Sequence, residues 1–124
     1  MHSILLIDDD PDVRTVMSIL LKKHDYIVET ASSKEEAFIK LEQLMPSVIL
    51  LDVLLSGADG RDICREIKAN IVTKSIPIIM LSAHPSASDK ILTYGADDFI
   101  SKPVNTEDLL RKLENQVKEK GIVN

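Results

Sequence analysis

The chain has 124 residues, of which 20 are acidic and 15 basic, and a formal net charge of −5 at pH 7. This length fits one domain with a single core, and the acidic balance offers no broad positive surface for nucleic acid or an anionic membrane. No apolar run approaches the roughly 20 residues of a membrane-spanning helix, and a single cysteine, Cys64, excludes an intramolecular disulfide. We expect one cytoplasmic domain over residues 1–124 that binds neither nucleic acid nor membrane.

Short strand-like runs alternate with helical patterns along the chain. The predicted strands cover residues 3–7, 26–30, 47–51, 76–81 and 98–101. All but the second are apolar runs without polar alternation, which is typical of parallel strands that helices cover on both faces. The second run is rich in β-formers but more polar, and it is predicted to be an edge strand.

The first predicted helix follows a capping signal. Asp10 precedes Pro11, a pair typical of an N-cap and the first helical position. Apolar residues then recur at the helical spacing i, i+3, i+4, i+7 and i+8. They are Val13, Val16, Met17, Leu20 and Leu21.

Four further helical patterns follow. Ser33 and Glu36 have the spacing of a capping box and open a helix that is predicted to end before Pro46. The others are predicted through residues 63–67, over residues 86–94 as a short or irregular helix, and from residue 105 or 106 to before Gly121. Strand and helix alternate five times, which predicts an α/β fold with a doubly wound, three-layer parallel sheet.

Polar residues follow four of the predicted strands at the point where each strand ends. Asp8 and Asp9 follow the first strand, Asp52 the third, Ser82 the fourth and Lys102 the fifth. Parallel strands end at the same edge of a sheet, and open α/β sheets bind ligands there. We therefore expect these residues, which are distant in the chain, to converge on one site.

The three carboxylates of this set predict a cation site. Two like charges about 4 Å apart repel by on the order of 4 kcal/mol at an effective dielectric of 20. All the candidate ligands are oxygens, which favours Mg²⁺, with Mn²⁺ as the alternative, over zinc. Such a site suits phosphoryl chemistry, in which Lys102 and Ser82 bind phosphoryl oxygens. Asp52 stands alone at a strand end and is the candidate nucleophile.

The motifs that carry these residues match one family pattern in order. They are Ile7-Asp8-Asp9-Asp10, Leu50-Leu51-Asp52, Met80-Leu81-Ser82-Ala83, Gly95-Ala96-Asp97-Asp98-Phe99 and Lys102-Pro103. With them the chain resembles the receiver domain of bacterial two-component response regulators over nearly its whole length. The resemblance implies a flavodoxin-like (βα)5 fold with the strand order 2-1-3-4-5.

The resemblance also implies roles for individual residues. Asp52 is expected to accept a phosphoryl group from the phosphohistidine of a sensor histidine kinase or phosphotransfer protein. Asp9 would bind Mg²⁺ directly and Asp8 partly through water, with Asp52 and the backbone carbonyl of Leu54 completing the protein ligands. Lys102 is expected to contact the phosphoryl group and to precede a cis bond to proline.

Ser82 and Phe99 occupy the positions of the family's switch pair. Through them, phosphorylation is expected to change the face built by helix 4, strand 5 and helix 5, which a downstream output domain or protein reads. On this basis the chain is not an enzyme beyond its own phosphorylation and dephosphorylation. A homodimer through that face is left open, because the segment between Ser82 and Phe99 is shorter than is usual in the family and contains Pro85.

Two other functions remain open on the sequence alone. Asp8-x-Asp10 superficially matches phosphohydrolases with an aspartate nucleophile, although Asp52 would then have no role. The other alternative is a receiver that acts only as an interaction module without phosphorylation, which failure to bind Mg²⁺ would favour. Asp97 and Asp98 are expected to be solvated loop acids.

Overall fold

A parallel sheet forms the centre of the molecule. The computed structural model describes residues 2–55, 57–83 and 94–122, and the side chains of these ranges as far as residue 117. In this described part, five strands form one parallel sheet in the order β2-β1-β3-β6-β7. They are β1 (Ser3–Ile7), β2 (Ile27–Ala31), β3 (Val48–Asp52), β6 (Ile78–Ser82) and β7 (Asp98–Ser101). Counted along the chain this is the order 2-1-3-4-5, so the predicted fold class and topology are confirmed.

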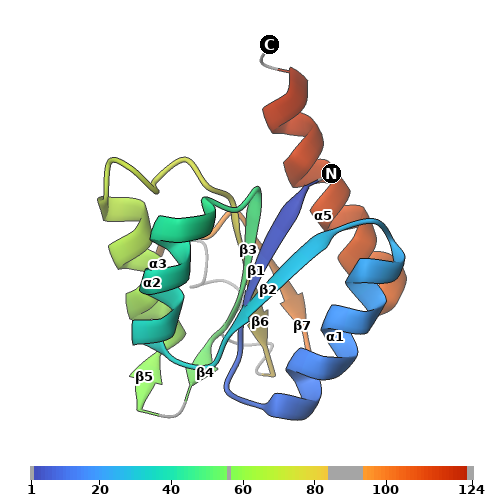
Figure 1. Cartoon of the computed structure of the whole chain (residues 1–124), viewed down its shortest axis with the longest axis horizontal. Coiled ribbons are helices and arrows are strands. Elements are labelled where there is room, and N and C mark those ends of the chain that lie inside the picture. The colour runs from blue at the N-terminus through green and yellow to red at the C-terminus, as the bar shows by residue number, and fades with distance from the viewer. Residues whose placement is uncertain (1, 56, 84–93, 123–124) are drawn as a thin grey trace.

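Helices cover both faces of the sheet (Figure 1). α1 (Pro11–Lys23) and α5 (Thr106–Ile122) lie on one face, and α2 (Lys34–Leu44) and α3 (Gly60–Ala69) lie on the other. The helix predicted over residues 86–94 falls on the gap 84–93 and so lies outside the described residues. None of the helices described is both long and apolar enough to cross a membrane.

Alternation along the central strands builds a separate apolar cluster on each face. Leu5 and Leu51 belong to the cluster under α2 and α3, whereas Leu6 and Leu50 belong to the cluster under α1 and α5. All four side chains are 0% exposed. Successive side chains of a strand point to opposite faces, so a strand covered on both faces must be apolar at every position. Cys64 is buried in the first cluster, as a small hydrophobe would be.

The predicted capping signals are present at α1 and α2. Asp10 Oδ1 accepts a hydrogen bond from Asp12 N (2.9 Å), and the following proline is the first helical residue. Ser33 Oγ accepts a hydrogen bond from Glu36 N (3.2 Å), which is one half of a capping box. The reciprocal bond differs from the prediction, because Glu36 Oε1 accepts from Ser32 N (2.6 Å) and not from Ser33 N.

Several predicted boundaries are wrong by one or two residues. The fourth strand begins at Ile78 and not at residue 76, because Pro77 has no N–H to donate to the ladder. Its carbonyl still accepts a hydrogen bond from Ile49 N (2.9 Å). β2 lies one residue later than predicted, at an edge of the sheet as expected, and α5 continues to Ile122.

The core stripe of α1 is narrower than predicted. Met17 and Leu21 are buried, and Val13 and Leu20 pack partly against the same cluster. Val16, which was expected in the stripe, is 65% exposed. Neighbouring residues of a helix point about 100° apart, so a helix centred on Met17 turns Val16 to its margin.

Candidate functional site

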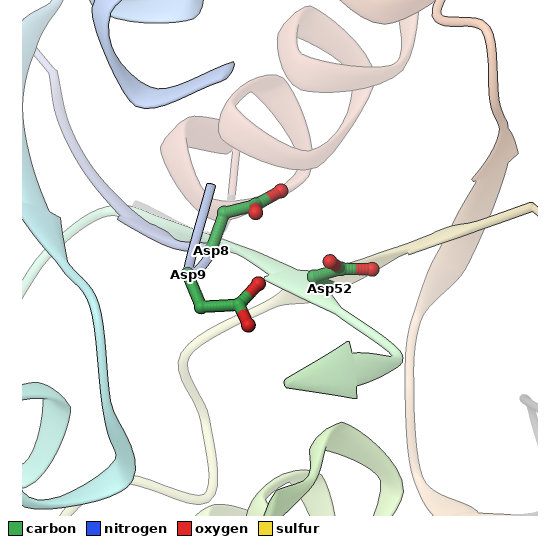
Figure 2. A group of neighbouring side chains, drawn as sticks. All are labelled: Asp8, Asp9 and Asp52. Carbon is green, nitrogen blue, oxygen red and sulfur yellow. The ribbon is translucent and has the colours of Figure 1, made fainter. Parts of the chain in front are cut away.

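The carboxyl ends of four adjacent strands bring the predicted polar residues to one edge of the sheet. Asp8 directly follows β1, Asp52 ends β3, Ser82 ends β6 and Lys102 directly follows β7. Asp9 follows Asp8, and the two approach Asp52 from the neighbouring strand end (Figure 2). The edge that parallel pairing was expected to create therefore contains all five residues.

Three of these residues form a compact acidic cluster. The cluster consists of Asp8, Asp9 and Asp52, and one carboxylate oxygen from each lies within 4.8 Å of the others. Asp8 is 0% exposed and Asp52 is 7% exposed, while Asp9 is half-buried. Asp8 Oδ1 accepts a hydrogen bond from Asp10 N (2.9 Å), and the backbone carbonyl of Asp8 accepts one from Arg14 Nη1 (2.7 Å). These bonds hold the segment after β1 against the strand end.

Lys102 reaches two of the three carboxylates. Its Nζ lies 3.4 Å from Asp8 Oδ2 and 3.2 Å from Asp52 Oδ2, and its side chain is 27% exposed. The Lys102 N–H donates to the Ser82 carbonyl (2.7 Å), and the bond to Pro103 is cis, as the resemblance implied. Burial alone would lower the pKa of Lys102, but the charges of Asp52 and Asp8 outweigh it and raise the pKa. The side chain is therefore an ammonium at neutral pH.

The same surroundings make ionised Asp52 unfavourable. Burial raises the pKa of Asp52, the charge of Asp8 raises it further, and the nearby Lys102 only partly opposes them. Asp8 and Asp52 together place two carboxylates beside the one ammonium of Lys102. A cation bound among them would favour the ionised forms and relieve the repulsion.

Ser82 and Phe99 lie on one face of two paired strands. The register of β6 and β7 pairs Ser82 with Ser101 and Met80 with Phe99. Residues two apart on a strand point to the same face, so both predicted switch residues face the cluster under α2 and α3. Ser82 is 3% exposed, and Phe99 is half-buried against that cluster. Asp52 is paired with the residue that precedes Ser82.

A small hairpin follows β3 where a loop was predicted. β4 (Leu54–Leu55) pairs antiparallel with β5 (Ala58–Asp59). Leu54 N donates a long hydrogen bond to Asp52 Oδ1 (3.4 Å), and the Leu54 side chain is 56% exposed. The hairpin thus keeps the backbone of Leu54 beside Asp52. That the Leu54 carbonyl is a metal ligand stays a prediction.

Gly60 allows this hairpin to fold back onto the strand end. It is the first residue of α3, and its N–H donates to the Val53 carbonyl (2.7 Å). A Cβ at this position would lie 2.0 Å from the Asp52 carbonyl oxygen, so any other residue here would force the backbone to move. The sequence analysis noted Gly60 only as a loop residue, although an Asp-Gly pair before a helical pattern could have signalled the close approach.

Asp97 and Asp98 have specific partners, so describing them as solvated loop acids was wrong. Asp97 Oδ2 accepts hydrogen bonds from Ile78 N (2.8 Å) and Lys68 Nζ (2.8 Å), which ties the start of β6 to α3. Asp98 Oδ1 lies 3.4 Å from Lys112 Nζ. Both partners depend on the order of strands and helices in space, and the local sequence carries no signal for them.

The acidic cluster has the chemistry of a hard divalent metal site. Its donors are three carboxylates, with no histidine or cysteine in the group. An all-oxygen set suits Mg²⁺ or Mn²⁺ and not zinc. Asp10, the second acid of the phosphohydrolase-like motif, is exposed and occupied as the N-cap of α1. The hydrolase alternative therefore lacks its second carboxylate in this cluster.

A doubly wound parallel sheet with acids and a lysine at its carboxyl edge defines a class of signalling domain. The family model for the response regulator receiver domain matches residues 4–114, and the chain belongs to this family. Receiver domains act together with histidine kinases and output domains.

Solved structures of receiver domains superpose closely on this chain. Chemotaxis protein CheY4 of Vibrio cholerae is 30% identical with a TM-score of 0.86, over 93% of this chain and 98% of that one. A response regulator receiver domain protein of Clostridium thermocellum is 27% identical with a TM-score of 0.91, over 100% of both chains. The BeF3-activated N-terminal receiver domain of Klebsiella pneumoniae RstA is 29% identical with a TM-score of 0.84, over 93% and 97% of the two chains.

Proposed function

We propose that this receiver domain is a phosphoacceptor, in which Asp52 takes a phosphoryl group from the phosphohistidine of a sensor histidine kinase or phosphotransfer protein. The observation that carries the proposal is the position of Lys102, whose Nζ lies 3.2 Å from Asp52 Oδ2 and 3.4 Å from Asp8 Oδ2. An ammonium held beside the attacking carboxylate can bind a phosphoryl oxygen as it arrives. Positioning and charge neutralisation are nearly all that phosphoryl transfer requires of a protein.

Asp8, Asp9 and Asp52 would hold Mg²⁺ in this proposal, with the Leu54 carbonyl as a further ligand and Mn²⁺ as a substitute. The buried, hydrogen-bonded Asp8 is already oriented by Asp10 N and Lys102 before any ion binds. When bound, the ion supplies positive charge that neutralises the oxygens of the transferring phosphoryl group.

The transfer itself forms one bond and breaks one. A carboxylate oxygen of Asp52 attacks the phosphorus atom, and a new P–O bond forms while the P–N bond to the donor imidazole breaks. The electron pair of that bond remains on the imidazole nitrogen. Lys102 stabilises the negative oxygens of the phosphoryl group, and the Ser82 hydroxyl, at the neighbouring strand end, donates a hydrogen bond to one of them.

The acyl phosphate is proposed to act through Ser82 and Phe99. Movement of Ser82 toward the phosphoryl group would leave space for the Phe99 ring on the same face of the sheet. Changing a population from 1:99 to 99:1 requires about 5.5 kcal/mol. A few charge-assisted hydrogen bonds at roughly 1.5–3 kcal/mol each supply that order. The expected output face combines β7, α5 and helix 4, of which helix 4 lies outside the described residues.

In this function the domain has no substrate besides its phosphoryl donor and its own phosphorylated form. It catalyses only its own phosphorylation and dephosphorylation, works in the cytoplasm, and passes its state to an output domain or protein. A homodimer through the output face is an open part of the proposal, to be decided by measuring the molecular mass in solution with and without phosphorylation.

The direct test is phosphoryl uptake measured by intact mass. The protein is incubated with Mg²⁺ and acetyl phosphate, beside Asp52→Asn and the control Asp25→Asn. Asp25 is exposed and has φ 68°, a conformation that asparagine tolerates well, so the control removes a carboxylate without strain. We expect one added phosphoryl group in the wild type and the control, and none in Asp52→Asn.

Metal dependence is tested in the same assay. Removal of Mg²⁺ with a chelator should abolish uptake, and Mn²⁺ should restore it. A folded wild-type protein that takes up no phosphoryl group and does not bind Mg²⁺ would contradict the proposal. That result would favour the interaction module that works without phosphorylation.

A further inference from the structure

Lys112 of α5 reaches across the edge of β7 that faces away from β6 and contacts Phe99. Its Nζ donates a hydrogen bond to the Phe99 carbonyl (2.6 Å) and lies 5.1 Å from the centroid of the Phe99 ring. The same nitrogen is 3.4 Å from Asp98 Oδ1 and 3.9 Å from Asp108 Oδ2. The Lys112 side chain is only 20% exposed, so its charge is held in one place.

The ammonium is anchored by the backbone of β7 and by acids, independently of the ring. β7 is the last strand of the sheet in the described residues, so within them the outward backbone groups of Phe99 pair with no further strand. The Phe99 N–H donates to Asp98 Oδ1 (2.8 Å), and the carbonyl accepts from Lys112. The Asp98–Lys112 pair thus satisfies the outward N–H and carbonyl of Phe99, the groups through which an edge strand could pair with another strand.

The opposite edge of the sheet has the same backbone contact without an aromatic ring. There Lys40 of α2 donates to the Thr30 carbonyl of β2 (2.5 Å) and lies 3.9 Å from Glu29 Oε2. Among the described residues, a lysine and an acid thus make this edge contact at β2 with no aromatic ring as a partner. What distinguishes β7 is that the lysine also faces the ring of the residue whose carbonyl it holds.

That additional contact favours one position of the ring. An ammonium near an aromatic ring is attracted to it, and partial burial strengthens the attraction. Phe99 is half-buried beside Lys112 at the edge of the sheet. Movement of the ring inward, toward the space beside Ser82, would separate it from the anchored charge.

We propose that Lys112 is a positioning residue for the Phe99 switch, holding the ring at the sheet edge and opposing its inward movement. The inference rests on the proposed function, because it assigns the ring movement to phosphorylation. Lys112 then sets how readily the domain is phosphorylated, without touching the phosphoryl group.

Fluorine NMR can follow the Phe99 ring with only one other signal in the spectrum. The chain has two phenylalanines, Phe38 and Phe99, so labelling with 4-fluorophenylalanine gives two signals, and Phe38 is an internal control. Lys112→Gln should shift the Phe99 signal and leave the Phe38 signal in place. Lys112→Arg, which keeps a cation and its donors, should retain the wild-type signal. Lys40→Gln removes the matching contact at the other edge and should shift neither.

A double-mutant cycle separates the ring contact from the backbone contact. Lys112→Gln should raise the rate of phosphoryl uptake from acetyl phosphate about threefold, the size of a partly buried cation–π contact. In a Phe99→Leu background the backbone hydrogen bond and the Asp98 pair remain but the aromatic ring is gone. There the same change should have no effect on the rate. Urea unfolding of every variant verifies that the measured protein is folded.

Each outcome decides the inference. An unmoved Phe99 signal in Lys112→Gln, a slower uptake, or an equal rate effect in both backgrounds would overturn it. Absence of uptake by the wild type would instead overturn the proposed function. The fluorine spectra, recorded without a phosphoryl donor, would still show whether Lys112 positions the ring.

Discussion

Strand β3 passes from an apolar interior to a charged edge within five residues. Leu50 and Leu51 are 0% exposed and lie in the two apolar clusters, whereas Asp52, 7% exposed, lies among two other carboxylates and Lys102. Burial of Leu50 and Leu51 stabilises the fold, whereas at Asp52 the fold has to hold like charges close together. Stability and the proposed function are therefore separated along one strand, and substitutions in its apolar interior and at its charged edge should differ in size and sign.

The largest loss of stability is expected in the interior. Leu50→Ala should lower the free energy of unfolding by about 2–5 kcal/mol, because it leaves a cavity between the sheet and the helices α1 and α5. Ile39→Ala, at a residue that is 58% exposed on α2, should change it by less than about 0.5 kcal/mol. Urea unfolding with an unchanged slope checks both. If Leu50→Ala lowered the free energy of unfolding by less than about 1 kcal/mol, burial in the interior of β3 would not be a main source of stability.

Removing the positive charge of Lys102 should make the repulsion among the carboxylates at the sheet edge measurable. Lys102→Met should destabilise the metal-free protein by about 2 kcal/mol, less than the roughly 3–5 kcal/mol of a fully buried pair because Lys102 is 27% exposed. Addition of Mg²⁺ should recover part of the loss, since a bound cation replaces the missing positive charge.

Lys23→Met is the control for this change, because Lys23 is exposed in the last turn of α1. Thermal unfolding with and without Mg²⁺ measures both variants. Equal unfolding temperatures for Lys102→Met and Lys23→Met would mean that Lys102 does not neutralise the cluster.

A glycine substitution should displace the charged edge without altering its charges. Gly60→Ala should cost about 1–3 kcal/mol, because its Cβ would lie 2.0 Å from the Asp52 carbonyl oxygen and the backbone must move. It should also weaken Mg²⁺ binding, measured by titration calorimetry.

Gly57→Ala is the matched comparison within the same hairpin region. Gly57 has φ 75° with no neighbouring atom within 4 Å, so alanine there costs about 1–2 kcal/mol in backbone strain alone. Its Mg²⁺ affinity should match the wild type. Equal Mg²⁺ affinity in the two variants would argue against a role for Gly60 in placing Asp52.

The smallest effect has the opposite sign. Asp52→Asn should stabilise the metal-free protein by about 1 kcal/mol at pH 7, because it removes a buried charge that Asp8 repels. The raised pKa of Asp52 means that the folded state takes up a proton before the unfolded state as the pH falls. The contribution of Asp52 to wild-type stability therefore becomes more favourable on acidification, and the advantage of the variant over the wild type should shrink.

Urea unfolding at pH 7 and pH 5 follows this advantage, and saturating Mg²⁺ at pH 7 should reverse it. A variant that is less stable than the wild type in metal-free buffer would show that Lys102 more than compensates the repulsion at this edge.

The positions at strand ends were predictable from the sequence, and the contacts around them were not. Asp8, Asp52 and Lys102 could be assigned to one edge because unbroken apolar runs imply parallel strands. The distances that make Lys102 a partner of both acids depend on the turn from β7 into α5. Val16 is a second example. The helical pattern predicted it to be a core residue, but the orientation of α1 on the sheet leaves it exposed.

The sequence by itself determined the alternation of strands and helices, the caps of α1 and α2, and the residues at the strand ends. Each of these follows from local backbone preference or from the burial of apolar side chains, and both act over a few neighbouring residues. Only the tertiary structure decided that Asp97 ties β6 to α3 and that Lys112 crosses the edge of β7 to Phe99. Those contacts join segments that meet only after the layers have packed, so no local pattern records them.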